Sequence, residues 1–126
     1  MGLAYPSLAA YNLNPVFDNI IQQHKLKKNV FSFYLEDKHK TSQKSILMLG
    51  GVDKSLIEGE ILYYPVVDKR YWTIEASQIL IDGKDVGLCR GGCRLVVDTG
   101  TSLITSPSDE YFSLMCKHTS HIIIQL

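Results

Sequence analysis

No run of apolar residues in this chain approaches the roughly 18 that a membrane-spanning helix needs. The sequence also lacks an excess of charge, since 13 basic side chains balance 13 acidic ones, so we expect no nucleic-acid partner and no membrane surface. The first ten residues, MGLAYPSLAA, contain neither a basic segment nor a long apolar one, and we predict no signal peptide. With 126 residues, 45% of them hydrophobic, the composition predicts about one globular domain.

Cysteine is scarce, and its spacing leaves several interpretations open. Cys89 and Cys93 lie close together in CRGGC, while Cys116 stands alone. The two glycines would let a small disulfide loop close, which would indicate an oxidising compartment. A zinc site with Cys116, His118 and His121 as further ligands is an alternative, although the spacing matches no common zinc pattern. Free thiols are the third possibility. We predict no metal and no cofactor.

Two short helices are expected. The first follows Asn14-Pro15, because apolar side chains then recur three and four residues apart as far as His24. It ends at the basic KLKK of residues 25–28, where cations suit the helix dipole. The second helix follows Ser106-Pro107, with the serine as its N-cap and an acidic residue, Asp109, three positions later.

Most of the remaining chain shows the alternation of apolar and polar residues that is typical of strands. We expect strands at 29–35, 45–49, 61–64, 71–74, 79–81, 86–88 and 94–97. Asp82-Gly83 is a strong signal for a hairpin turn between two of them. Residues 116–126 fit either one strand or a trailing segment. The sequence therefore predicts a mostly β fold with two short helices.

One carboxylate ends the last of these apolar strands. In RLVVDTGTSLIT, residues 94–105, Asp98 is followed at once by Thr99, Gly100, Thr101 and Ser102. Burying an ionised carboxylate is costly unless hydrogen bonds satisfy it, and such a cost is usually tolerated where the group has a function. The glycine lets the backbone approach the carboxylate, and the hydroxyls can donate to it. Taken alone, however, this motif would indicate only a capping aspartate in a tight turn.

The surrounding sequence adds to this motif. VVDTGTSLIT resembles the second catalytic motif of the pepsin-like aspartic proteases, the A1 family. The resemblance runs in order and spacing from residue 2 to about residue 115. It includes six further segments: GLAYPS, NPVFDNI, NVFSFYL, LMLGGVD, GEILYYPVV and YWTIEASQILIDG.

The resemblance implies a mostly β, partial pepsin-like bilobal acid protease fold. Residues 1–28 would be the end of the N-terminal lobe, 29–45 the interlobe strand region, and 46–115 part of the C-terminal lobe. Residues 116–126 would be a tail unlike the family. CRGGC resembles the family's small disulfide loop, which implies a bridge between Cys89 and Cys93.

The resemblance also implies a mechanism. Such enzymes activate a water between two aspartates that share one proton, because two carboxylates about 3 Å apart cannot both ionise. Asp98 would be one of the two, supported by the four residues that follow it. Three residues would line the substrate cleft: Tyr71, Val96 and Thr101.

No other DTG-type motif occurs in the chain. We therefore expect a fragment of an aspartic endopeptidase that lacks the first catalytic aspartate, the first lobe and its flap, and that is inactive alone. Its complete form would cleave polypeptide substrates in the secretory or endolysosomal pathway. A homodimer like the retroviral proteases is disfavoured, because only 28 residues follow Asp98 to build a flap and a closing sheet. The alternative is a non-catalytic truncated or spliced chain that at most binds peptide or a partner protein.

Overall fold

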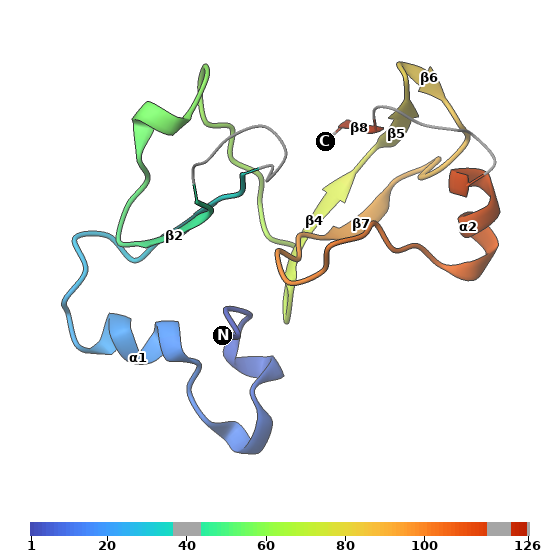
Figure 1. Cartoon of the computed structure of the whole chain (residues 1–126). Coiled ribbons are helices and arrows are strands. Elements are labelled where there is room, and N and C mark those ends of the chain that lie inside the picture. Colours follow the sequence, from blue (N-terminus) through green and yellow to red (C-terminus); the bar gives the residue numbers. More distant parts are fainter. Residues whose placement is uncertain (37–43, 116–121, 126) are drawn as a thin grey trace. The chain divides into compact units, whose positions relative to one another are not determined.

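The computed structural model describes residues 1–36, 44–115 and 122–125, and the chain divides into two compact units, Met1–Tyr63 and Tyr64–Leu126 (Figure 1). The described residues form short strands and few helices, in agreement with the predicted mostly β, partial pepsin-like fold. None of the described helices is long and apolar enough to cross a membrane. The division into lobe, interlobe and tail segments stays a prediction.

Helix α1, Val16–Gln22, follows two short 3-10 turns, η1 Pro6–Leu8 and η2 Ala10–Asn12. The helix ends earlier than its apolar pattern predicts, because His24 adopts a left-handed conformation (φ 51°) that turns the chain out of the helix. Phe17 is the buried residue of α1, and its ring lies edge-on to Phe31 with the ring centroids 5.0 Å apart. This aromatic contact fixes the helix against the strand that follows.

The first unit contains one antiparallel strand pair, β1 Phe31–Tyr34 and β2 Ile46–Leu49, within the segments where strands were predicted. The Gly50 N–H donates to the carbonyl oxygen of Val30 (2.7 Å) at the end of this pair. Gly50 has a φ of 86°, a conformation that glycine adopts without strain, so the chain turns sharply there. A third 3-10 turn, η3 Lys54–Leu56, follows.

The second unit contains two three-stranded antiparallel sheets and one helix. One sheet has the order β3-β4-β7, formed by Asp68–Lys69, Trp72–Ala76 and Cys93–Val96. The other has the order β6-β5-β8, formed by Lys84–Asp85, Gln78–Ile81 and Ile122–Gln125. Helix α2, Ser108–Met115, lies between β7 and β8 in the chain.

The hairpin turn at Asp82-Gly83 forms between β5 and β6 as predicted. Both turn residues are left-handed, with φ values of 49° and 75°, as a type I′ turn requires. The returning strand is shorter than expected and lies at Lys84–Asp85 instead of 86–88. β8 pairs with the other edge of β5, so the C-terminal segment contains a strand.

Two further local predictions are wrong. No strand forms at 61–64, where the side chains are between 40% and 84% exposed. The following Pro65 has no N–H to donate and restricts the residue before it to extended conformations. Ser106 does not cap α2, since its hydroxyl is buried without a partner among the described residues. The carbonyl of Pro107 instead accepts from the N–H groups of Glu110 and Tyr111, both at 3.0 Å.

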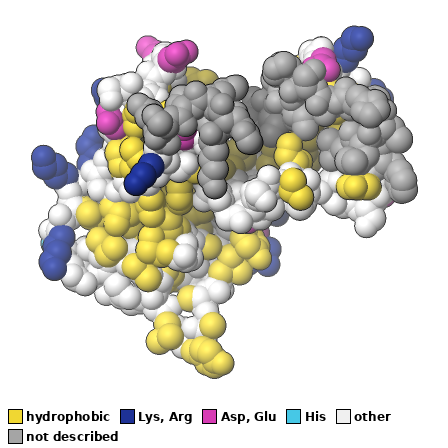
Figure 2. Space-filling view, in the orientation of Figure 1, with side chains coloured by type: hydrophobic (Ala, Val, Ile, Leu, Met, Phe, Trp, Pro, Cys, Tyr) yellow, Lys and Arg dark blue, Asp and Glu magenta, His cyan; other side chains and the backbone are white. Residues whose placement is uncertain are grey.

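Few large side chains are buried in the described parts of the chain. In the second unit, Ala76, Ile81 and Leu88 are at most 4% exposed. Many large apolar side chains are exposed instead, and Figure 2 shows apolar side chains in several surface patches. Such a small core supplies little hydrophobic stabilisation, so hairpins and hydrogen bonds matter more than usual for local order.

Candidate active site

Strand β7 carries the chain to Asp98 at one end of its ladder with β4. Val96 lies opposite Thr73, and the N–H of Val97 donates to the carbonyl oxygen of Trp72 (2.9 Å). The chain then leaves the sheet and turns. Asp98 is therefore the first residue after the last ladder hydrogen bond, which gives its position a rigid support on one side.

Both oxygens of the Asp98 carboxylate accept hydrogen bonds from the residues that follow. The backbone N–H of Gly100 donates to Oδ1 (2.8 Å), and the hydroxyl of Thr101 donates to Oδ2 (2.6 Å). The Thr101 hydroxyl first, and then the Gly100 N–H, hold the pKa of Asp98 below its ordinary value, while slight desolvation opposes them. The carboxylate is thus ionised near neutral pH and fixed in orientation.

The close approach of backbone to carboxylate favours glycine at position 100. A Cβ atom on Gly100 would lie 3.1 Å from Oδ1 of Asp98, which is tighter than an ordinary van der Waals contact. The need is for space and not for an unusual backbone angle, because Gly100 is absent from the glycines with positive φ. The sequence interpretation of this glycine is therefore supported by the geometry.

Asp98 is exposed in this chain, although the apolar strand before it suggested a buried carboxylate. Residues 97–105 are all exposed, and Val96 is 51% exposed. β7 pairs with β4 on one side only, and no element among the described residues covers the turn. The lowered pKa of Asp98 consequently comes from its hydrogen bonds and not from burial.

The other residues assigned to the site from the sequence lie at the same end of the β4–β7 ladder. Tyr71 directly precedes β4 and is 47% exposed. The register that sets Thr73 opposite Val96 would, if continued by two residues, set Tyr71 opposite Asp98. Thr99 and Ser102 are exposed and form no hydrogen bond with the described residues. Gly100 and Thr101 alone of the motif residues contact the carboxylate.

Sequence reasoning did not single out Trp72, whose backbone carbonyl receives the last hydrogen bond before Asp98. A carbonyl acceptor carries no side-chain signature, since every residue has one. The only available signal was the alternating pattern of residues 71–74, which predicts a strand but not its partner.

The described residues supply no acidic partner for Asp98. No other carboxylate among them is hydrogen-bonded to Asp98. They also contain no cluster of three or more His, Cys, Asp or Glu side chains that could hold a metal. Within the described part of the chain, Asp98 is a single ionised carboxylate without an acidic partner.

The predicted disulfide between Cys89 and Cys93 is confirmed, with the two Cα atoms 5.1 Å apart. It closes the loop at the other end of the β4–β7 ladder, where Cys93 lies opposite Ala76. The bridge therefore fastens the beginning of the strand that leads to Asp98.

Three residues of the alternative zinc site lie outside the described residues: Cys116, His118 and His121.

A hollow of about 610 Å³ also lies at this disulfide end of the ladder. Glu75, Arg94 and the backbone of Gly91 and Gly92 contribute to its lining. The ladder register separates it from the Asp98 turn, since Glu75 pairs with Arg94 while Val96 leads towards the motif. This hollow is not part of the candidate active site.

Replacing Thr101 by valine is expected to raise the pKa of Asp98, because valine keeps the branched shape and removes the principal donor. The native pKa is lowered, so the bond stabilises the fold above the ordinary pKa of aspartate, and this contribution is lost as pH falls through the native pKa. Titration of the Asp98 carboxyl carbon by NMR measures the shift. Thr99→Val is the matched control, and an equal shift in that variant would contradict the assignment.

Comparison with known proteins agrees with this geometry. A family model described as eukaryotic aspartyl protease matches residues 1–121. Cathepsin D of the dog is 44% identical over 110 residues, which are 87% of this chain and 27% of that protein. A pregnancy-associated glycoprotein of the horse is 44% identical over 114 residues, 90% of this chain and 29% of the relative. Gastricsin of the rabbit is 43% identical over 119 residues, 94% of this chain and 30% of the relative.

The chain thus spans less than a third of the length of these relatives. The family match nevertheless covers almost all of its own sequence, including the strand, turn and disulfide loop described above. The chain belongs to the eukaryotic aspartyl protease family.

Proposed function

We propose that this chain supplies one of the two carboxylates of an aspartic endopeptidase, and that Asp98 is that carboxylate. The observation that supports this most strongly is the doubly hydrogen-bonded state of its side chain at the end of β7. A general base must be ionised and held in place, and the N–H of Gly100 and hydroxyl of Thr101 meet both requirements.

In the proposed reaction, Asp98 takes a proton from a water molecule as that water attacks the carbonyl carbon of the peptide bond. The second carboxylate, from a lobe outside this chain, holds the proton that the pair shares and donates it to the carbonyl oxygen. The two hydrogen bonds to Asp98 favour its ionised form, which supports assigning the shared proton to the partner carboxylate. This division gives Asp98 the role of base.

We assign the peptide cleft to the surface beside the Asp98 turn. Tyr71 and Val96 are about half exposed and offer apolar surface next to the carboxylate for side chains of an extended peptide. Thr101 commits its hydroxyl to Asp98, so its contribution to substrate binding acts through the position of the carboxylate. The resemblance to the family supports these three assignments.

The compartment follows from the same proposal. The Cys89–Cys93 disulfide is typical of proteins that mature in an oxidising environment. Together with the family resemblance, it supports the secretory or endolysosomal pathway as the site of action.

A non-catalytic role is the second candidate, and one observation favours it. No carboxylate among the described residues lies in hydrogen-bonding contact with Asp98. This part of the protein therefore supplies one carboxylate, whereas the proposed reaction needs two. In this role, the chain would bind a peptide or a partner protein without cleaving it.

A chimaera tests the catalytic proposal. Residues 1–115 of this chain would replace the aligned segment of dog cathepsin D, which shares 44% identity with this chain over 110 residues. We expect hydrolysis of a fluorogenic peptide at about pH 4.5, blocked by a statine-type transition-state mimic. A chimaera that unfolds cooperatively and binds the mimic but cleaves no peptide would contradict the proposal.

A further inference from the structure

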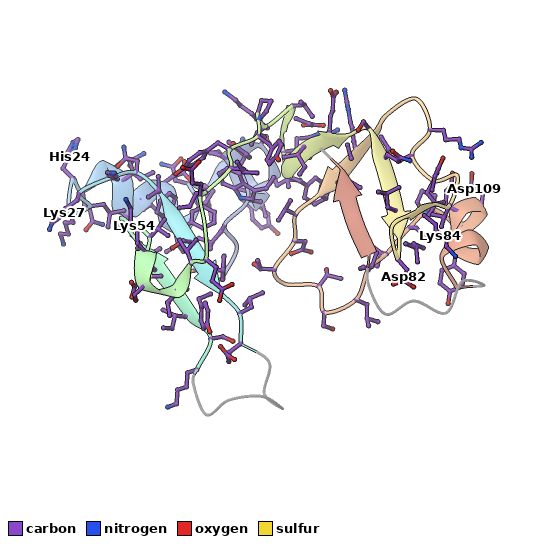
Figure 3. All side chains as sticks on the ribbon, turned by 90° about the horizontal axis from the view of Figure 1, so that it is seen from above. His24, Lys27, Lys54, Asp82, Lys84 and Asp109 are labelled. Carbon is purple, nitrogen blue, oxygen red and sulfur yellow. A yellow bond between two sulfur atoms is a disulfide. The ribbon has the colours of Figure 1, made fainter. Side chains whose placement is uncertain are left out.

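The loop between α1 and β1 carries three lysines in the sequence Lys25-Leu26-Lys27-Lys28. All three lysines are exposed, and Figure 3 shows Lys27 and the neighbouring His24 projecting away from the ribbon. The chain contains two pairs of adjacent basic residues, Lys27-Lys28 and Lys69-Arg70. The sequence alone does not distinguish these pairs, but their structural surroundings differ.

The backbone around the first pair forms no hydrogen bonds with the part of the chain that the structure describes. The N–H of His24 donates to Ile21 (2.9 Å), and the next backbone bond along the chain is accepted by Val30 (2.7 Å). Residues 25–29 form no hydrogen bond with any described residue. Leu26 is half-buried and lies near Gly50, since its Cδ2 atom lies 3.4 Å from where a Cβ of Gly50 would be. Extending this loop therefore breaks no hydrogen bond with a described residue.

The second pair is held in place. Lys69 lies opposite Trp72 in the β3–β4 hairpin. The guanidinium of Arg70 donates to both oxygens of Asp68, from Nε to Oδ1 at 3.2 Å and from Nη2 to Oδ2 at 2.8 Å. A protease could extend this segment only after breaking the hairpin and this paired contact.

We propose that the Lys28–Asn29 bond is a processing site for a serine endoprotease that selects paired basic residues. Exposed loops without backbone hydrogen bonds are the preferred sites of cleavage, because they adopt an extended conformation at low cost. The acidic subsites of such a protease would pair with the three lysines. Water adds across the amide bond, leaving a carboxylate on Lys28 and an amine on Asn29. The inference is independent of the role of Asp98.

The product would be a two-chain form whose parts stay associated. The ring of Phe17, on the N-terminal piece, lies 5.0 Å from that of Phe31, on the other piece. Leu26 and Gly50 also lie on opposite sides of the cut. Cleavage breaks neither contact, so we expect residues 1–28 and 29–126 to remain together under native conditions.

The test uses the full 126-residue chain and a subtilisin-type endoprotease selective for paired basic residues. We expect the first new N-terminus to be Asn29, released at least about tenfold faster than cleavage after Arg70. In denaturant that the protease tolerates, the two sites should be cut at similar rates. Mass spectrometry and N-terminal sequencing identify the products, and size exclusion should show both pieces eluting together.

Two kinds of variant test the proposal: one removes the lysine pair that the protease recognises, and the other changes how easily the loop extends. Lys27→Gln with Lys28→Gln should abolish the Asn29 product, whereas Lys54→Gln should leave it unchanged. Leu26→Ala should speed cleavage by removing the half-buried side chain that lies near Gly50. Cleavage after Arg70 first, equal rates at both pairs in the native chain, or no cut after Lys28 would each overturn the processing site. Pieces that separate on native sizing would overturn the two-chain form.

Discussion

The 126-residue chain alone is expected to hydrolyse no peptide bond at any pH. One carboxylate can act as a general base, which typically contributes about 10²–10⁴-fold, but Asp98 cannot also protonate the substrate carbonyl. The exposed turn neither excludes water nor orients a peptide, so the contribution of proximity is also missing. The measurement is the rate of hydrolysis of a fluorogenic peptide from about pH 3 to about pH 7, with the Asp98→Asn chain as the inactive reference.

The outcome that would contradict this expectation is specific. Turnover that a statine-type mimic inhibits, and that disappears in Asp98→Asn, would mean that the single motif suffices. A rate that is second order in chain concentration would point to two copies sharing one site. In either case, the interpretation of the chain as half of a catalytic pair would be wrong.

Asp98→Asn in the cathepsin D chimaera is expected to reduce kcat by about 10⁴-fold or more, because the amide cannot accept the proton of the attacking water. The fold should change little. The asparagine oxygen can still accept from the Gly100 N–H, and the Thr101 hydroxyl can rotate to accept from the amide. Since Asp98 is exposed, no buried charge is left unpaired.

The matched control for this variant is Asp82→Asn. Asp82 lies in the type I′ turn between β5 and β6, where Asn-Gly is at least as favourable as Asp-Gly. This control removes one negative charge from the same unit without touching the motif. Its kcat should therefore stay near that of the parent chimaera, and a comparable loss in both variants would indicate a general effect of charge.

The strand pattern of the sequence predicted much of the fold because side-chain alternation reports which segments can pair. It succeeded for β1 and β2, and for the Asp82-Gly83 hairpin, where local turn chemistry determines the structure. It failed at 61–64, where Pro65 limits pairing despite the apolar residues. It also gave no partner for the C-terminal strand, since the pairing of β8 with β5 is a long-range contact.

The candidate site shows the same division between local and long-range information. The contacts of Asp98 with Gly100 and Thr101 are local, and the spacing of the motif predicted both kinds of donor. The exposure of Asp98 could not be predicted, because burial depends on what the rest of the protein places over the turn. Neither could the role of the Trp72 carbonyl, which depends on the register between β4 and β7.

The central claim is that Asp98 is a catalytic carboxylate. The most direct test compares kcat among three proteins: the parent chimaera, its Asp98→Asn variant and its Asp82→Asn variant. All three proteins are assayed on one fluorogenic peptide at about pH 4.5, with binding of the statine-type mimic and thermal unfolding as controls for an intact site. We predict turnover in the parent and in Asp82→Asn, and a loss of about 10⁴-fold in Asp98→Asn with unfolding unchanged. Turnover in Asp98→Asn within about tenfold of the parent would contradict the claim.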